Sequence, residues 1–174
     1  MTGEQTETET CFKEITYRKP LITDGRSIYN LVKKSPPLDL NSLYHYLIFC
    51  HYYNETSIVA EKDDSITGFI SGFLKPGDGK TLFVWQVVVD ESCRGKGTAK
   101  KMLDEIIARP CCAQVAYLET TVTPSNSASR SFFSSFARDY AAFLRESVLF
   151  PSSLFGKKSH EDEVLFTIGP LKRK

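Results

Sequence analysis

Residues 87–99 read Val-Val-Val-Asp-Glu-Ser-Cys-Arg-Gly-Lys-Gly-Thr-Ala, and this stretch decides the fold. An apolar strand ending near Asp90 passes through a short polar turn into a loop with two glycines, Gly95 and Gly97, and the loop opens a helix. Glycine lets backbone N–H groups approach a ligand without interference from a Cβ atom, and the helix N-terminus adds the positive end of its dipole. The stretch therefore predicts a site for a phosphate or pyrophosphate group.

Three motifs compete for this loop. A Walker A loop is excluded, because Leu74 stands where the motif that would end at residues 79–81 needs its first glycine. A dinucleotide-binding fingerprint fits poorly, since Lys100 replaces the third small residue and residues 90–94 separate the strand from the loop. A plain glycine-containing turn between strand and helix is the structural alternative. The remaining pattern is R-x-x-G-x-A, at Arg94, Gly97 and Ala99.

Hydrophobic periodicity on both sides of this stretch predicts a mixed α/β sheet packed by helices. Thr23 is the expected N-cap of the first helix, and Asp39 or Asn41 that of the second. Helices are expected over residues 24–34, around Leu43, Leu47 and Ile48, over residues 98–108, and from residue 124 through Phe136. Strands are expected at residues 12–18, 56–61, 66–74, 81–90, 115–122, 147–150 and 163–168, with the apolar strand 81–90 in a central position.

Composition excludes several classes of protein. The 174 residues carry 22 Lys and Arg against 21 Asp and Glu, a formal net charge of +1. This balance argues against a nucleic-acid or membrane-surface binder, either of which usually shows a basic excess. The apolar stretches at 43–50 and 82–89 are too short to span a bilayer, and the acidic, polar N-terminus does not resemble a secretory signal. Five cysteines without a C-x-x-C pair indicate a reduced, cytoplasmic chain.

The length predicts one domain. Residues 1–11 are expected to form a flexible tail, residues 12–170 the domain, and residues 171–174 a short basic tail.

The R-x-x-G-x-A loop after a hydrophobic strand, together with the order of the elements, resembles the Gcn5-related N-acetyltransferases (GNAT). A second signature of that family, N-x-x-[AS]-x-x-x-[YF], is matched by Asn126, Ser129 and Phe133. The resemblance implies an α/β (α+β) fold whose mostly antiparallel sheet is splayed between its fourth and fifth strands. It also implies acetyl-CoA as cosubstrate, with no metal.

The resemblance assigns the coenzyme-binding residues one by one. The backbones of Val87 and Val89 would pair with the pantetheine arm, and Asn126 would touch its end, although its structural alternative is helix N-capping. Phe133 occupies the place of a tyrosine that in many members protonates the departing thiolate, so that proton must come from elsewhere. The pyrophosphate would be held by the side chain of Arg94 and by the amides of Gly95, Lys96, Gly97, Thr98 and Ala99.

Four further segments resemble the diaminobutyrate acetyltransferases of ectoine biosynthesis, which acetylate the γ-nitrogen of L-2,4-diaminobutyrate. The segments are residues 35–44, 83–87, 119–126 and 160–166. They carry a candidate acceptor pocket in which carboxylates balance ammonium charge and Trp85 offers a flat wall. Each candidate also has a purely structural interpretation. These are a helix cap for Asp39, core packing for Trp85, a rim position on a helix for Tyr44 and a solvated turn for residues 160–163. The predicted acceptor-binding residues are Asp39, Tyr44, Trp85, His160 and Glu163.

The expected mechanism is direct attack of the neutral amine on the thioester, with an oxyanion stabilised by a strand amide near Val87. Glu163 is the candidate base and Tyr44 the candidate proton donor. No acyl-enzyme is needed, so Cys93, Cys111 and Cys112 are not predicted nucleophiles. Two alternatives stay open: a different small amine or a protein N-terminus as acceptor, or an acyl-CoA-binding module without catalysis. The resemblance also implies a homodimer.

Overall fold

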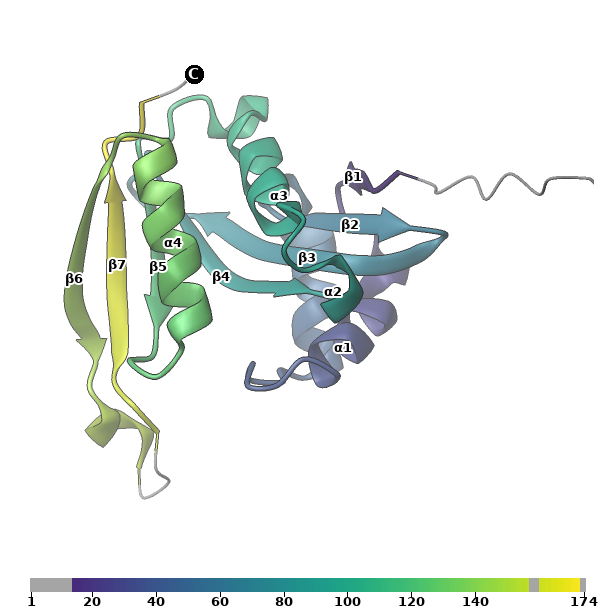
Figure 1. The fold of residues 1–174 in the computed structure, drawn as a ribbon, viewed down its shortest axis with the longest axis horizontal. Coiled ribbons are helices and arrows are strands. Elements are labelled where there is room, and N and C mark those ends of the chain that lie inside the picture. The colour runs from purple at the N-terminus through teal and green to yellow at the C-terminus, as the bar shows by residue number, and fades with distance from the viewer. Residues whose placement is uncertain (1–13, 157–159, 173–174) are drawn as a thin grey trace, which may run out of the picture.

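Seven strands form one sheet in the order β1-β2-β3-β4-β5-β7-β6 (Figure 1). The structure, a computed structural model, describes residues 14–156 and 160–172. The strands are β1 (Thr16–Arg18), β2 (Ile58–Lys62), β3 (Ser65–Leu74), β4 (Thr81–Val89), β5 (Tyr117–Val122), β6 (Phe143–Phe150) and β7 (Glu163–Gly169). The helices are α1 (Gly25–Lys33), α2 (Leu43–Tyr52), α3 (Thr98–Ile107) and α4 (Ser127–Asp139). The predicted order of elements is confirmed, and β4 lies at the centre of the sheet.

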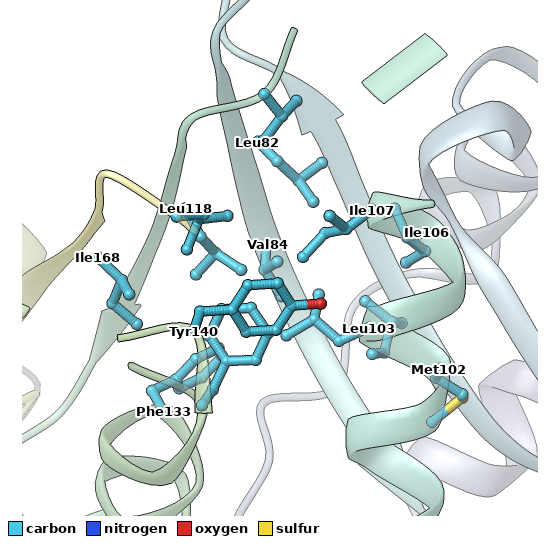
Figure 2. Close-up of a cluster of buried hydrophobic side chains, with 14 of the residues drawn as sticks. Leu82, Val84, Met102, Leu103, Ile106, Ile107, Leu118, Phe133, Tyr140 and Ile168 are labelled. Atoms are coloured by element: carbon cyan, nitrogen blue, oxygen red, sulfur yellow. The ribbon is translucent and has the colours of Figure 1, made fainter. Parts of the chain in front are cut away.

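The two faces of the sheet carry separate hydrophobic clusters. Helices α3 and α4 cover one face, where Leu103 and Ile106 pack with Phe133 against Leu82 and Leu118 (Figure 2). Helices α1 and α2 cover the other face and pack Ile28, Tyr46 and Phe49 against Val59, Phe69 and Val88. Burial of these apolar surfaces, at roughly 25 cal/mol per Å², is what fixes both helix pairs on the sheet.

Two predicted caps are wrong. Thr23 lies inside a short 3₁₀ turn (Ile22–Asp24), and α1 begins after Asp24, whose carboxylate bonds Arg18. At α2 the cap is Ser42, whose Oγ accepts a hydrogen bond from the His45 amide at 3.2 Å. Serine and aspartate side chains cap the third amide of a helix about equally well when their backbone is in the β region. Residue type alone therefore could not distinguish Asp39, Asn41 and Ser42 as the cap.

The C-terminal part of the chain differs most from prediction. Strand β6 starts at Phe143, four residues before the expected start, because it is an edge strand exposed on nearly its whole length and shows no inward–outward alternation. Strand β1 is shorter than expected. Leu171, assigned to a basic tail, is buried in the first cluster, and its amide donates to the Ala116 carbonyl. The predicted tail over residues 1–11 lies outside the described residues.

The sheet opens between β4 and β5. These strands run parallel and pair over Thr81–Phe83 with Tyr117–Glu119, after which no further pairing joins them in the described structure. Strand β4 also carries a bulge: Ser71 pairs with Gln86 and Gly72 with Val84, so Trp85 is the extra residue. A bulge reverses the alternation of side chains. Leu82 and Val84 therefore face α3, while Gln86 and Val88 face α2.

Candidate active site

The loop before α3 presents backbone amides to an open space. Gly95 and Gly97 have φ values of +72° and +78°, a conformation that favours glycine. Gly97 is the N-cap of α3 and supplies no side-chain bond, so the first amides of the helix remain available. Both features are those of an anion site at a helix N-terminus, as the sequence predicts.

Side chains around the loop are mostly engaged in holding its shape. Arg94 Nε donates to the Val89 carbonyl at 2.9 Å, and Thr98 Oγ1 donates to the Cys93 carbonyl at 3.1 Å. Lys96 Nζ turns back to the Ser92 carbonyl at 2.8 Å. Hydrogen bonds from the Ser92 hydroxyl and amide lower the pKa of Asp90. The Thr98 hydroxyl is buried and already donates to the Cys93 carbonyl, so Thr98 can contact a ligand through its backbone amide and not through its hydroxyl.

A hollow of about 380 Å³, here called the loop hollow, runs from this loop along the open edge of β4. Its walls include five predicted residues besides Val87 and Val89, and Lys96 is not among them. Phe132 and Ala128, one turn apart on α4, complete the far wall and were not predicted. The lining residues are Val87, Val89, Cys93, Arg94, Gly95, Gly97, Thr98, Ala99, Lys100, Ala128, Ser129 and Phe132.

A second hollow of about 380 Å³, the wedge hollow, fills the gap between β4 and β5. Val87 and Ser129 line both hollows, so the two spaces meet where the sheet opens. Four of the five predicted acceptor residues lie here, namely Asp39, Trp85, His160 and Glu163, together with Asn126 and Phe133.

Three acceptor-capable side chains converge in the wedge hollow. His160 Nε2 lies 3.8 Å from Glu163 Oε1 and 4.0 Å from Asp39 Oδ2. The ring of His160 stacks on Phe155 with centroids 4.0 Å apart, and its Nδ1 lies 2.6 Å from the Glu161 carbonyl oxygen. A carbonyl oxygen can only accept, so Nδ1 carries a proton, and in the tautomer protonated at Nδ1 alone the Nε2 lone pair faces the hollow. This arrangement of a lone pair and two carboxylates complements a group with several N–H donors.

Trp85 forms an aromatic wall of the wedge hollow and remains half exposed. The ring is supported from behind by His45, Phe49 and Phe83, at centroid distances of 5.4, 6.1 and 6.5 Å. Burial lowers the pKa of His45, which keeps this support neutral. The alternative of a tryptophan buried in the core is wrong, because Trp85 is half exposed and lines the wedge hollow.

Tyr44 does not reach the wedge hollow. Its side chain is 71% exposed and is absent from the lining in the described part of the chain. The side chains that α2 buries are Tyr46, Phe49 and Cys50, so Tyr44 lies on the exposed side of the helix. The structure of one chain therefore gives Tyr44 no place as a proton donor in this hollow.

The remaining predicted residues, Asn126 and Phe133, line the wedge hollow and also have structural roles. Asn126 caps α4, with its Oδ1 accepting from the Ser129 amide at 3.0 Å, and its contact with a coenzyme stays a prediction. Phe133 is buried and offers no hydroxyl at the end of the wedge hollow.

The acidic run 161–163 is partly exposed, and it is also bonded to neighbouring segments. Glu161 accepts hydrogen bonds from the hydroxyl and amide of Ser125, and Asp162 accepts from the Ser152 amide at 2.6 Å. These bonds fasten the segment before β7 to the residues that precede α4 and to the turn that follows β6, and Glu163 faces the hollow.

Several lining residues escaped the sequence analysis. Helical spacing from Ala128 would have found Phe132. No local pattern pointed to Gln86, Phe150 or Phe155, since their positions depend on the bulge and on an irregular segment.

Within residues 14–156 and 160–172, no group of three or more His, Cys, Asp or Glu side chains is placed to hold a metal ion. No helix there combines the length and apolarity needed to cross a bilayer. Four cysteines in the same part of the chain, Cys50, Cys93, Cys111 and Cys112, are free thiols.

Comparison with known proteins gives the geometry a context. The sequence model of the Acetyltransferase (GNAT) family matches residues 25–137. The L-2,4-diaminobutyric acid acetyltransferase of Halalkalibacterium halodurans is 45% identical over 157 residues, covering 90% of this chain and 82% of that protein. The enzyme of the same name from Marinococcus halophilus is 41% identical over 170 residues, covering 98% of each.

Solved structures agree. Diaminobutyrate acetyltransferase EctA from Paenibacillus lautus, in complex with its substrate L-2,4-diaminobutyric acid and coenzyme A, superposes with a TM-score of 0.88 at 41% identity. The match covers 92% of this chain and 98% of that one. Ard1 from Thermoplasma volcanium superposes with a TM-score of 0.69 at 17% identity, covering 92% and 99%, which shows a shared fold and no more.

Proposed function

The chain belongs to the GNAT family of acetyltransferases, and we propose that it transfers the acetyl group of acetyl-CoA to the side-chain amine of L-2,4-diaminobutyrate. The product is N-γ-acetyl-2,4-diaminobutyrate, an intermediate for the compatible solute ectoine. The observation that carries this proposal is the meeting of the two hollows at Val87 and Ser129. An anion-binding loop for the coenzyme and an acceptor-lined recess for a diamine open onto one point, where the thioester and the amine react.

The coenzyme occupies the loop hollow in this proposal. The amides of residues 95–99 and the guanidinium of Arg94 hold the pyrophosphate. Among the residues that the structure describes, β4 has no strand partner on the β5 side beyond Phe83, so its backbone groups on that side can pair with the pantetheine arm. One strand amide near Val87 stabilises the oxyanion that forms on the thioester carbonyl.

The diamine occupies the wedge hollow. Asp39, His160 and Glu163 accept hydrogen bonds from its nitrogens, and the face of Trp85 lies against its cationic end. An alkyl ammonium has a pKa near roughly 10, so one proton must leave before attack. Glu163, whose side chain is 18% exposed, takes that proton directly or through a water molecule.

The proton balance follows from the reaction. The ammonium loses one proton to Glu163 before attack, and the tetrahedral intermediate loses a second as the C–S bond breaks. That second proton goes to the departing thiolate, through solvent, because Phe133 has no hydroxyl and Tyr44 lies outside the hollow. Acetyl passes directly from the coenzyme to the amine through this tetrahedral intermediate, without a covalent acyl-enzyme.

Two copies of the chain associate in this proposal. Strand β6 is the last strand of the sheet, and along it Phe143, Val148 and Phe150 are 74%, 55% and 45% exposed. An apolar edge of this kind promotes pairing with another chain, and a twofold dimer covers the same surface on both copies. Light scattering measures the mass, and Val148→Asp is expected to shift it from dimer to monomer.

The enzyme works in the cytoplasm in this proposal. The free cysteines Cys50, Cys93, Cys111 and Cys112 are consistent with a reducing compartment.

Product analysis tests the function. NMR of the products after incubation with acetyl-CoA and L-2,4-diaminobutyrate is expected to show acetylation at the γ-nitrogen. Ornithine, lysine and a peptide with a free N-terminus, assayed in parallel, separate the diamine from other acceptors. Binding of acetyl-CoA with no turnover on any of these amines would instead indicate a non-catalytic module.

A further inference from the structure

Two buried polar side chains lie beneath the segment that carries Asp39. Tyr46 on α2 has no exposed surface, and Gln86 on β4 is 8% exposed. Tyr46 packs edge-on against Tyr29 and Phe69, with centroids 6.2 and 6.3 Å away, which fixes the position of its hydroxyl. Polar groups at such depth need partners, and these two find them in each other and in the segment above.

The hydrogen bonds form a chain with both ends on the backbone of one tripeptide, residues 39–41. The Asn41 amide donates to Tyr46 Oη at 3.3 Å, and that hydroxyl donates to Gln86 Oε1 at 3.2 Å. Gln86 Nε2 then donates to the Asp39 carbonyl at 2.9 Å. Burial raises the pKa of Tyr46, so the hydroxyl keeps the proton that it donates.

These three hydrogen bonds hold the backbone at Asp39 and at Asn41, on each side of Leu40, and do not involve the Asp39 carboxylate. The Asp39 side chain is 89% exposed, yet its Oδ2 lies 4.0 Å from His160 Nε2 across the wedge hollow. An exposed aspartate on a loop normally samples several positions, and its ordering on binding weakens affinity. On the preceding side, Leu38 packs against the cluster that contains Tyr46 and Val88.

The bulge in β4 places Gln86 where its side chain can form these hydrogen bonds. With regular alternation of the same residues, the side chain of Gln86 would point to the α3 face together with Leu82 and Val84. The bulge instead turns Gln86 toward α2, to the side on which Trp85 already packs against His45 and Phe49. The irregularity thus anchors the segment opposite the His160 ring directly beside the aromatic wall.

We propose that Tyr46 and Gln86 are positioning residues, which hold residues 39–41 so that the Asp39 carboxylate is preset to receive the ammonium group of the acceptor. Tyr46 lines neither hollow, and Gln86, which borders the wedge hollow, has both ends of its amide bonded to Tyr46 and to the Asp39 carbonyl, so both residues act through the segment that carries Asp39. This inference rests on the proposed function, because it requires a cationic acceptor in the wedge hollow. The proposal therefore predicts that substitution of Tyr46 or Gln86 changes binding of the acceptor and leaves binding of the coenzyme unchanged.

The test is steady-state kinetics of Gln86→Met and Tyr46→Phe, each alone and combined with Asp39→Ala. Each single variant is expected to raise KM for L-2,4-diaminobutyrate by about tenfold, the scale of a lost orienting contact, with KM for acetyl-CoA unchanged. In the Asp39→Ala background the same substitutions are expected to add less than about twofold, since the group that they position is gone. Hydrogen exchange of the Asn41 amide is expected to accelerate in Tyr46→Phe.

Tyr140→Phe is the matched control. It removes another buried tyrosine hydroxyl, which donates to Asp104 at 2.8 Å on the opposite face of the sheet, and is expected to leave both KM values unchanged. Full additivity with Asp39→Ala, an equal rise in KM for acetyl-CoA, or faster exchange at Asn41 with no change in KM would each overturn the proposal. Absence of diaminobutyrate acetylation by the unmodified protein would contradict the proposed function, whereas the exchange measurement reports on the anchoring bonds independently of it.

Discussion

The imidazole of His160 lies 3.8 Å from the carboxylate of Glu163, Nε2 to Oε1, at the mouth of the opening between β4 and β5. Stacking on Phe155 and the contact of Nδ1 with the Glu161 carbonyl hold the ring in this orientation. This contact places the Nε2 atom of His160 beside Glu163, the residue proposed as the base. In the proposed mechanism His160 accepts a hydrogen bond from the diamine and Glu163 removes its proton, so the two roles lie side by side.

Replacement of Glu163 by glutamine is expected to reduce kcat by about 10²–10⁴-fold, the usual range for a lost general base. The change keeps the size and one oxygen acceptor of the side chain, so KM for the diamine should change less than kcat. The measurement is initial rate against pH: activity of the variant should recover as pH approaches the amine pKa near roughly 10, where the substrate loses its own proton.

Glu105→Gln provides the control for loss of a carboxylate. Glu105 pairs with Lys101 on the exposed side of α3 and should be kinetically silent. An unchanged kcat in Glu163→Gln would remove this residue from the role of base.

Trp85→Ala is expected to raise KM for the diamine by about tenfold or more, because a cation–π contact and a desolvating wall, together about 1–2 kcal/mol, are lost. Trp85→Phe should restore much of this affinity. Because Trp85 is half exposed, thermal unfolding should show small losses of stability for both variants. A Trp85→Ala protein with native KM and a strongly lowered melting temperature would indicate that the ring serves the core alone.

The sequence predicted the coenzyme side of the site better than the acceptor side. The loop at residues 94–99 is local: strand, two glycines and helix follow one another, so its geometry is set by neighbours in the chain. The acceptor residues meet through tertiary structure. Asp39 precedes α2 and His160 precedes β7, and their 4.0 Å contact depends on how both segments are fastened to the sheet.

The errors have separate physical causes. Periodicity predicts which face a side chain occupies only while the register is regular, and the bulge at Trp85 breaks it, so the position of Gln86 was missed. Tyr44 was assigned to the pocket from family resemblance, whereas α2 buries Tyr46, Phe49 and Cys50 and leaves Tyr44 on its exposed side. Family resemblance named the acceptor residues, and the structure brings four of the five together.

Acid is expected to destabilise the protein partly through Asp24. Burial by itself would raise the pKa of Asp24, but hydrogen bonds from Arg18 and the Leu21 amide, with the Arg18 charge, outweigh it and lower that pKa. A lowered folded-state pKa contributes stability that is present above the unfolded value near 3.9 and is lost as pH falls through the folded one.

Asp24→Asn is therefore expected to lower the free energy of unfolding at pH 7 by about 1–3 kcal/mol, the range for hydrogen bonds to a charged group. The difference from the unmodified protein should shrink as pH drops below about 4. Urea unfolding at several pH values measures it. A difference that stays constant from pH 7 to pH 3 would contradict the assignment of this pH dependence to Asp24.

Gly97→Ala is expected to weaken binding of acetyl-CoA selectively, and Gly77→Ala is its matched control. Both glycines have φ of +78° and open space around an added Cβ, so alanine should destabilise each by a similar amount, about 1–2 kcal/mol. At Gly97 that open space is the loop hollow, where the methyl group would meet the pyrophosphate, whereas Gly77 lies in the turn between β3 and β4. KM for acetyl-CoA should rise more than tenfold in Gly97→Ala, with KM for the diamine nearly unchanged, and stay native in Gly77→Ala. Equal effects of the two substitutions on KM would show that the loop amides at Gly97 do not contact the coenzyme.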